Sequence, residues 1–250
     1  MKTILIADDQ PLNQQLFSMI INKLGYHSIF ADDGYKVLEQ IRENDVDLIF
    51  MDIQMPKMNG SKAAEILRKS GFTKPIIAVT AEEKLQEQER FLTEGFNDVI
   101  IKPVKKTDAE EMIRKWLNAS IEAGKDDEKP HVTIQKSGTF SAEVMLNNFM
   151  NNKEAALPLL SRFIERTKNQ LENFRALIEA GDWATARQET HMIKGSAPTM
   201  GGSELGKAAA KLESACINNS LDEVEKAFPL LSEAFSLYKK EAENYIHSQG

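Results

Sequence analysis

The stretch THMIKGSAPTMGG, residues 190–202, combines side chains that could carry out phosphate chemistry with the spacing of a helix. His191, Lys194 and Gly195 would place a nucleophilic imidazole, a cation and a missing side chain on one small surface. A glycine inside a helix costs about 1 kcal/mol relative to alanine. We therefore expect Gly195 to have a function that compensates for this loss of helix stability.

A second group of polar residues occurs in the first half of the chain, at the ends of short apolar runs. These residues are Asp8, Asp9, Asp52, Thr80 and Lys102. In an open parallel sheet the carboxyl ends of the strands bind ligands. If the first and third strands are neighbours, three carboxylates share one crevice and repel one another unless a cation is present. Mg²⁺ prefers such hard oxygen ligands, so the pattern predicts a metal-assisted phosphoryl-transfer site.

The elements that would position the second group alternate along residues 1–118. Short β-branched runs such as TILIAD and VDLIFMD are separated by longer segments of helical spacing such as LNQQLFSMIINKLG. Five such βα rounds, joined by right-handed crossovers, predict an α/β domain with a five-stranded parallel sheet and helices on both faces.

The second half of the chain has a different pattern. The polar stretch GKDDEKPHVTIQKSG predicts a linker, and everything beyond it has helical spacing. The expected helices cover residues 140–151, 153–180, 182–200, 203–218 and 221–247. We therefore predict three parts: a domain over 1–124, a linker over 125–139 and an antiparallel four-helix bundle with one lead-in helix over 140–250.

Composition and charge argue against several classes of protein. The 250 residues are 42% hydrophobic with a formal net charge of -7, shared almost evenly between 1–124 and the remainder. Neither half has the basic balance of a nucleic-acid binder, so a transcription factor is disfavoured.

Cys216 is the only cysteine, which excludes a disulfide framework and suggests a small core residue on a helix. Without a signal-peptide pattern or 18 consecutive apolar residues, we expect a cytoplasmic protein with no membrane partner.

Acidic residues at strand ends are, one at a time, more often helix caps or solvated loop residues. As a set, however, the motifs ADD, MDIQMPKMNG, VTA and IKPV resemble the receiver domain of two-component response regulators, which has a flavodoxin-like fold. The resemblance implies that Asp52 is the phosphoacceptor and that Thr80 and Lys102 hold the phosphoryl oxygens. It also implies a magnesium shell formed by Asp8, Asp9, Asp52 and the backbone carbonyl of Gln54.

One position departs from the receiver pattern. Receivers often carry an aromatic residue three positions before the lysine, where it swings inward on activation, but this chain has Val99 there. Phe96 is aromatic but out of register with that position. In this family a threonine and the aromatic residue together form the usual activation switch. The part played by the threonine could still occur at Thr80, whereas a change of aromatic rotamer is impossible at Val99.

A helical wheel separates the two faces of the predicted helix over 182–200. The core stripe is Trp183, Ala186, Thr190, Ile193, Ala197 and Met200. His191 then lies away from the core and Gly195 nearly opposite it, facing outward. HMIKGSA, followed by LGKAAAKLESA, resembles the His-x-x-Lys-Gly signature of histidine phosphotransfer (HPt) domains. That implies phosphorylation of His191, charge compensation by Lys194 and close approach of a receiver at Gly195.

The two resemblances together predict a phosphorelay intermediate. The phosphoryl group would come from a separate sensor histidine kinase or a small phosphodonor, because no kinase nucleotide-binding motif is recognisable, and would pass to a downstream receiver. Exchange between Asp52 and His191 in one chain is a further possibility, since a flexible linker of this length reaches about 20 Å. Two alternatives stay open: a phosphorylation-regulated binding module in which His191 is incidental, and a phosphate sink.

Overall fold

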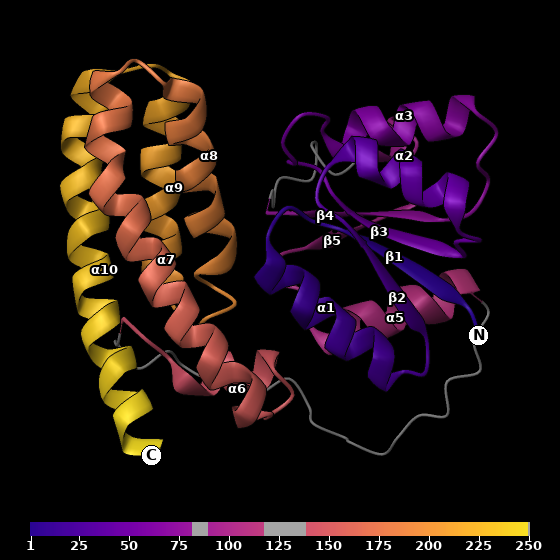
Figure 1. The fold of residues 1–250 in the computed structure, drawn as a ribbon, viewed down its shortest axis with the longest axis horizontal. Helices are drawn as coiled ribbons and strands as arrows, with labels where there is room; N and C mark the ends of the chain where they lie inside the picture. The colour runs from indigo at the N-terminus through magenta and orange to yellow at the C-terminus, as the bar shows by residue number, and fades with distance from the viewer. Residues whose placement is uncertain (82–89, 118–138, 250) are drawn as a thin grey trace. The chain divides into compact units, whose positions relative to one another are not determined.

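The computed structural model describes residues 1–81, 90–117 and 139–249. The chain divides into two compact units, Met1–Glu128 and Lys129–Gly250, each drawn in Figure 1. The predicted linker lies outside the described residues except for Thr139. Its boundaries therefore stay a prediction.

The first unit is built around a parallel sheet. Its described strands are β1 (Thr3–Ala7), β2 (His27–Ala31), β3 (Leu48–Asp52), β4 (Ile76–Thr80) and β5 (Asp98–Ile101). They pair in the order β2-β1-β3-β4-β5. Every residue of β3 and β4 is buried, which explains their continuous apolar sequences. Strands β1 and β3 are hydrogen-bonded neighbours, as the prediction of a shared acidic crevice required.

Helices cover both faces of this sheet. The described ones are α1 (Pro11–Lys23), α2 (Gly34–Glu43), α3 (Gly60–Lys69) and α5 (Lys106–Leu117). Figure 1 shows α1 and α5 on one face and α2 and α3 on the other. Local chemistry sets their starts: Asp33 and Asn59 accept from the backbone N–H three residues later, and Pro11 opens α1. The predicted α/β architecture is confirmed.

The second unit is helical throughout its described residues. Its elements are α6 (Ala142–Asn148), α7 (Lys153–Glu179), α8 (Trp183–Ser196), α9 (Ser203–Ile217) and α10 (Leu221–Gln249). Helix α9 packs against α8 and α10, and α7 packs against the same two helices, which closes a four-helix bundle (Figure 1). The predicted bundle with a lead-in helix is therefore confirmed, and Cys216 is a buried residue of α9 as expected.

The lead-in helix α6 packs against the turn that follows α8. Ser141 N donates to the Gly201 carbonyl at 2.9 Å, and Asn148 Nδ2 donates to the Thr199 carbonyl at 2.9 Å. Helix α8 ends at Ser196, four residues earlier than predicted, because the chain turns there and reaches φ +74° at Gly201. The turn directs the chain into α9.

No helix among the described residues combines the length and apolar character needed to span a bilayer.

Candidate functional site

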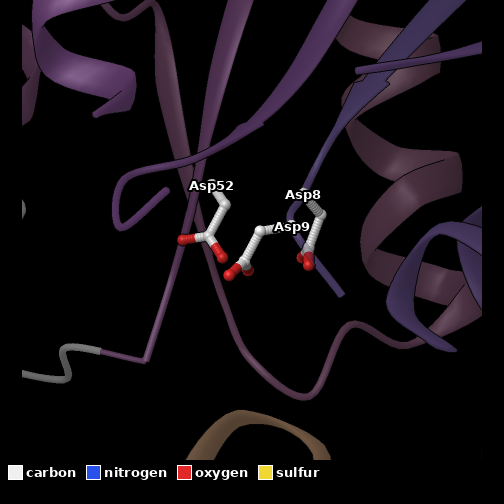
Figure 2. Close-up of side chains that lie close together, drawn as sticks. All are labelled: Asp8, Asp9 and Asp52. Atoms are coloured by element: carbon white, nitrogen blue, oxygen red, sulfur yellow. The ribbon is translucent and has the colours of Figure 1, made fainter. Parts of the chain in front are cut away.

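The sheet brings the three predicted carboxylates together. Asp8 and Asp9 follow the end of β1, and Asp52 is the last residue of β3 beside it. Each offers a carboxylate oxygen that lies within 4.8 Å of the oxygens of the other two. Figure 2 shows the three side chains directed toward a common region. The crowding predicted from the strand ends is therefore present.

Lys102 joins this cluster from the residue after β5. Its Nζ lies 2.8 Å from Asp8 Oδ2 and 2.5 Å from Asp52 Oδ2, and its side chain is 8% exposed. Burial lowers the pKa of the ammonium, but the charges of Asp52 and Asp8 outweigh burial and raise the pKa above its ordinary value. Lys102 thus stays charged between the two carboxylates.

The pKa of Asp8 moves in the direction opposite to that of a simple ion pair. Burial raises it most, Lys102 lowers it, and the neighbouring charge of Asp52 raises it again. Three carboxylates against one ammonium leave two formal negative charges at a largely buried site. The cluster therefore fits a divalent cation with oxygen ligands, both in donor type and in charge.

The loop after β3 places Asp52 and Gln54. Gln54 N donates to Asp52 Oδ1 at 3.0 Å, so the carboxylate is oriented by its own loop. The loop closes tightly at Gly60, whose N donates to the Ile53 carbonyl at 2.9 Å. A Cβ at Gly60 would lie 2.2 Å from the backbone oxygen of Asp52, so the loop requires glycine there.

Thr80 ends β4 at the same edge of the sheet as Asp52. In the β3–β4 register Asp52 pairs with Val79, so Thr80 is one residue further along, and its carbonyl accepts from Lys102 N at 2.7 Å. Thr80 therefore lies at the same edge of the sheet as the acidic cluster, and the ammonium of Lys102 contacts that cluster directly. Val99 is partly buried and packs against the core, and Phe96 is buried with its ring 6.2 Å from that of Phe91.

The second predicted site lies on α8. His191 Nδ1 is 2.7 Å from Glu213 Oε1, and Lys194 Nζ donates to Glu213 Oε2 at 3.0 Å. The side chain of Glu213 is 5% exposed, whereas those of His191 and Lys194 are 12% and 26% exposed. Glu213 of α9 therefore joins the two predicted residues of α8 through one carboxylate.

Glu213 is ionised in this arrangement. Burial raises its pKa, but the hydrogen bond and charge of His191, followed by the charge and hydrogen bond of Lys194, bring the net pKa below its ordinary value. Two turns earlier on α9, a Cβ at Gly206 would lie 3.1 Å from Pro198 side-chain atoms and 3.5 Å from the Lys194 carbonyl. The close approach of α9 to α8 therefore occurs at Gly206, and it brings Glu213 to His191.

Sequence reasoning missed Glu213, although a signal for it exists. Ala209, Leu212, Glu213 and Cys216 are all buried in α9, so Glu213 is a charged residue at core spacing. Charged residues are almost never fully buried unless they are paired. An acidic residue at such a position, one helix after a histidine, indicates an ion-pair partner.

The predicted outward orientation of Gly195 is wrong. Gly195 is buried, together with Met192 and Ser196 on either side of it along the helix. The helical wheel assumed one core direction, but α8 packs against α9 and also against α7, where Arg166 Nη2 lies 2.7 Å from Met192 Sδ. More of the helix circumference is covered than one stripe suggests, and a glycine has no side chain to extend past its neighbours.

The comparisons with known proteins match both units. Residues 4–114 match the family model of the response regulator receiver domain, and residues 158–241 match that of the Hpt domain. The chain is 24% identical over 238 residues to the sensor histidine kinase GacS of Pseudomonas protegens, covering 92% of this chain and 25% of that protein. It is 29% identical over 211 residues to the sensor protein EvgS of Escherichia coli, covering 84% and 17%. The chain thus spans a quarter or less of the length of these curated relatives.

Solved receiver structures resemble the first unit. The receiver domain of the sensor histidine kinase PA1611 from Pseudomonas aeruginosa, solved with magnesium coordinated in its active-site cleft, is 29% identical, with a TM-score of 0.44. That match covers 47% of this chain and 98% of the solved one. A Francisella response-regulator receiver is 27% identical, with a TM-score of 0.44 over 47% of this chain and 95% of the other.

The acidic cluster lies in the unit that matches the receiver-domain model, and His191 lies in the unit that matches the Hpt-domain model. The chain therefore combines a segment similar to receiver domains, residues 4–114, with a segment similar to Hpt domains, residues 158–241.

Proposed function

We propose that Asp52 accepts a phosphoryl group, that His191 carries one, and that the chain relays it between a sensor histidine kinase and a downstream receiver. The observation that carries this proposal is the contact of His191 Nδ1 with the ionised Glu213 at 2.7 Å. When the imidazole is neutral, its Nδ1–H donates a hydrogen bond to the carboxylate, which leaves the lone pair on Nε2. That lone pair is the nucleophile a phosphohistidine requires.

Asp9, Asp52 and the Gln54 carbonyl, with Asp8 behind them, are the groups that would hold Mg²⁺. Asp8 already accepts hydrogen bonds from Lys102, Asn13 and the backbone of Gln10, whereas Asp52 Oδ1 accepts from Gln54 N. Mg²⁺, when bound, supplies charge neutralisation for the phosphoryl oxygens. Thr80 and Lys102 then provide a hydroxyl donor and an ammonium donor to the same oxygens.

Transfer between the two residues is a simple displacement. Nε2 of His191 attacks the phosphorus of an aspartyl phosphate, the N–P bond forms and the O–P bond breaks, and the electron pair returns to the carboxylate of the aspartate. The Nδ1 proton stays on the imidazole, where Glu213 compensates the positive charge that develops. Lys194, one turn after His191 and more exposed, is placed to meet the phosphoryl oxygens.

The partners that this chemistry needs are a phosphohistidine donor for Asp52 and an aspartate acceptor for His191. A histidine kinase and a downstream receiver have these chemistries, and similar segments occur in the sensor histidine kinase GacS and the sensor protein EvgS. We propose no nucleic-acid or membrane partner.

Gly195 is proposed to admit a receiver because it has no side chain beside His191. Gly195→Ala should therefore slow transfer from a phosphorylated receiver.

The test is to phosphorylate the purified chain with a candidate kinase or with acetyl phosphate and to map the label. We expect acid-labile phosphohistidine at His191 that depends on Asp52, and no label on the receiver unit of Asp52→Asn. Label confined to Asp52 in the presence of candidate receivers would instead support the phosphorylation-regulated binding module. If the label on His191 returns to a receiver that is coupled to the kinase, and none of it passes to a downstream receiver, the result would support the phosphate sink.

Transfer within one chain is tested separately by dilution. A mixture of Asp52→Asn and His191→Gln chains can transfer phosphate only between molecules. A wild-type rate that does not change on dilution, together with slow transfer in the mixture, supports exchange within one chain. A wild-type rate that falls in proportion to concentration, matched by the mixture, assigns His191 to other molecules.

A further inference from the structure

Two amide side chains near the start of α1 hold Asp8, and the phosphoryl-transfer steps above leave them without a role. Asn13 is buried, and its Nδ2 donates to Asp8 Oδ1 at 3.2 Å and to Asp8 Oδ2 at 3.0 Å. Gln14 donates from Nε2 to the Asp8 backbone carbonyl at 2.7 Å and to that of Ala31 at 3.1 Å. Helix α1 therefore fixes both the carboxylate and the backbone of Asp8.

These contacts complete the hydrogen bonding of the carboxylate. Asp8 Oδ1 also accepts from Gln10 N at 2.9 Å, and Oδ2 accepts from Lys102 Nζ at 2.8 Å. Three donor atoms thus approach the two oxygens, and Asn13 Nδ2 is shared between them. Lys102 and the Gln10 backbone approach one oxygen each, whereas Asn13 alone spans the two oxygens and so sets the rotation of the carboxylate plane.

We propose that Asn13 is a positioning residue for the divalent-cation site, acting through Asp8. Without it, Asp8 keeps one donor on each oxygen, from the Gln10 backbone and from Lys102, but no donor spans both oxygens. The carboxylate plane is then less firmly held, and the three carboxylates present a less fixed set of oxygens. The inference rests on the proposed Mg²⁺ site. Outer partners of metal-binding carboxylates commonly change metal affinity tenfold or more.

The test measures metal binding directly, without a phosphodonor. The full chain is titrated with Mn²⁺, and the free ion is followed by its electron paramagnetic resonance signal, with Mg²⁺ as competitor. We expect Asn13→Ala to bind Mn²⁺ about tenfold more weakly than the wild type. Gln15→Ala, which removes an exposed amide from the same helix, should leave the affinity unchanged.

A second readout separates positioning from simple loss of structure. In labelling with acetyl phosphate, the Mg²⁺ concentration for half-maximal rate should rise about tenfold in Asn13→Ala, while the rate at saturating Mg²⁺ stays within about twofold. Asn13→Ser, which keeps one short donor, should fall between the wild type and Asn13→Ala, and it serves as the test if the alanine variant does not fold.

The outcomes distinguish this inference from the site it depends on. If the wild type binds no Mn²⁺, the cation site itself is wrong. If the wild type binds and Asn13→Ala binds equally well, only the role of Asn13 is overturned. A loss of rate at saturating Mg²⁺ with unchanged affinity would also overturn it, because Asn13 would then act on the reaction rather than on the cation.

Discussion

The two reactive residues of this chain lie in contrasting environments. Asp52 is buried at a sheet edge among like charges, with Lys102 as a buried cation between two of the three carboxylates. His191 lies on a helix surface and shares one carboxylate with a partly exposed lysine. The Asp52 site is short of positive charge, whereas the His191 site is balanced by side chains alone.

The contrast shows how charge determines what each site needs from outside. A buried cluster with excess negative charge requires a cation before a dianionic phosphoryl group can enter. A neutral imidazole oriented by a carboxylate requires only a partner that brings the phosphoryl group. We therefore expect the two sites to respond differently to metal removal, to loss of their lysines, to loss of their glycines and to acid.

The largest difference is expected on metal removal. Chelation should reduce labelling of Asp52 by acetyl phosphate at least about a hundredfold, since the metal supplies several kcal/mol of charge stabilisation. Chemical labelling of His191 by phosphoramidate in the Asp52→Asn chain should change less than about twofold. Mass spectrometry of the labelled peptides measures both, and undiminished Asp52 labelling in chelator would contradict the magnesium assignment.

Loss of the lysines should separate the sites next. Lys102→Met leaves two buried carboxylates without their ammonium, so the metal-free receiver should lose about 3 kcal/mol of unfolding free energy. Mg²⁺ should restore part of that loss. Lys194→Met, at a 26% exposed side chain, should cost less than about 1 kcal/mol. Urea unfolding with and without Mg²⁺ compares the two variants. Equal losses of unfolding free energy would contradict the expected difference between the two sites.

Alanine at two tightly packed glycines should have a smaller but still unequal effect. A Cβ at Gly60 meets the backbone oxygen of Asp52 at 2.2 Å, so Gly60→Ala should cost about 2 kcal/mol and slow Asp52 labelling. At Gly206 the Cβ meets side-chain atoms of Pro198 at 3.1 Å, and alanine improves helix propensity. Gly206→Ala should change stability by less than about 1 kcal/mol. Thermal unfolding of the two variants provides the comparison.

The smallest effect is expected from acid at Glu213. Its folded pKa lies below the ordinary value of 4.5, so its contribution to bundle stability is present above that value and is lost as pH falls through the folded pKa. Glu213→Gln should reduce the pH dependence of the bundle's free energy of unfolding between about pH 5 and pH 3. Glu204→Gln, at an exposed position of α9, is the control for the same change of side chain on this helix. Denaturant unfolding across this pH range tests the difference.

Much of the fold follows from local patterns in the sequence. Apolar runs that end in Asp8, Asp52 and Thr80 specified buried parallel strands and the polar residues at their ends, because strand burial and strand direction leave a signature in every few residues. The spacing of His191 and Lys194 likewise placed both on one helix. Their role in phosphoryl transfer came from the resemblance and stays a proposal.

The contacts between elements were decided only by the tertiary structure. Glu213 reaches His191 because α9 approaches α8 at Gly206. The burial of Gly195 depends on how α7 and α9 both cover α8. Periodicity identifies the faces of a single helix, but hydrogen-bond partners and coverage depend on how neighbouring elements pack, which no short stretch of sequence encodes.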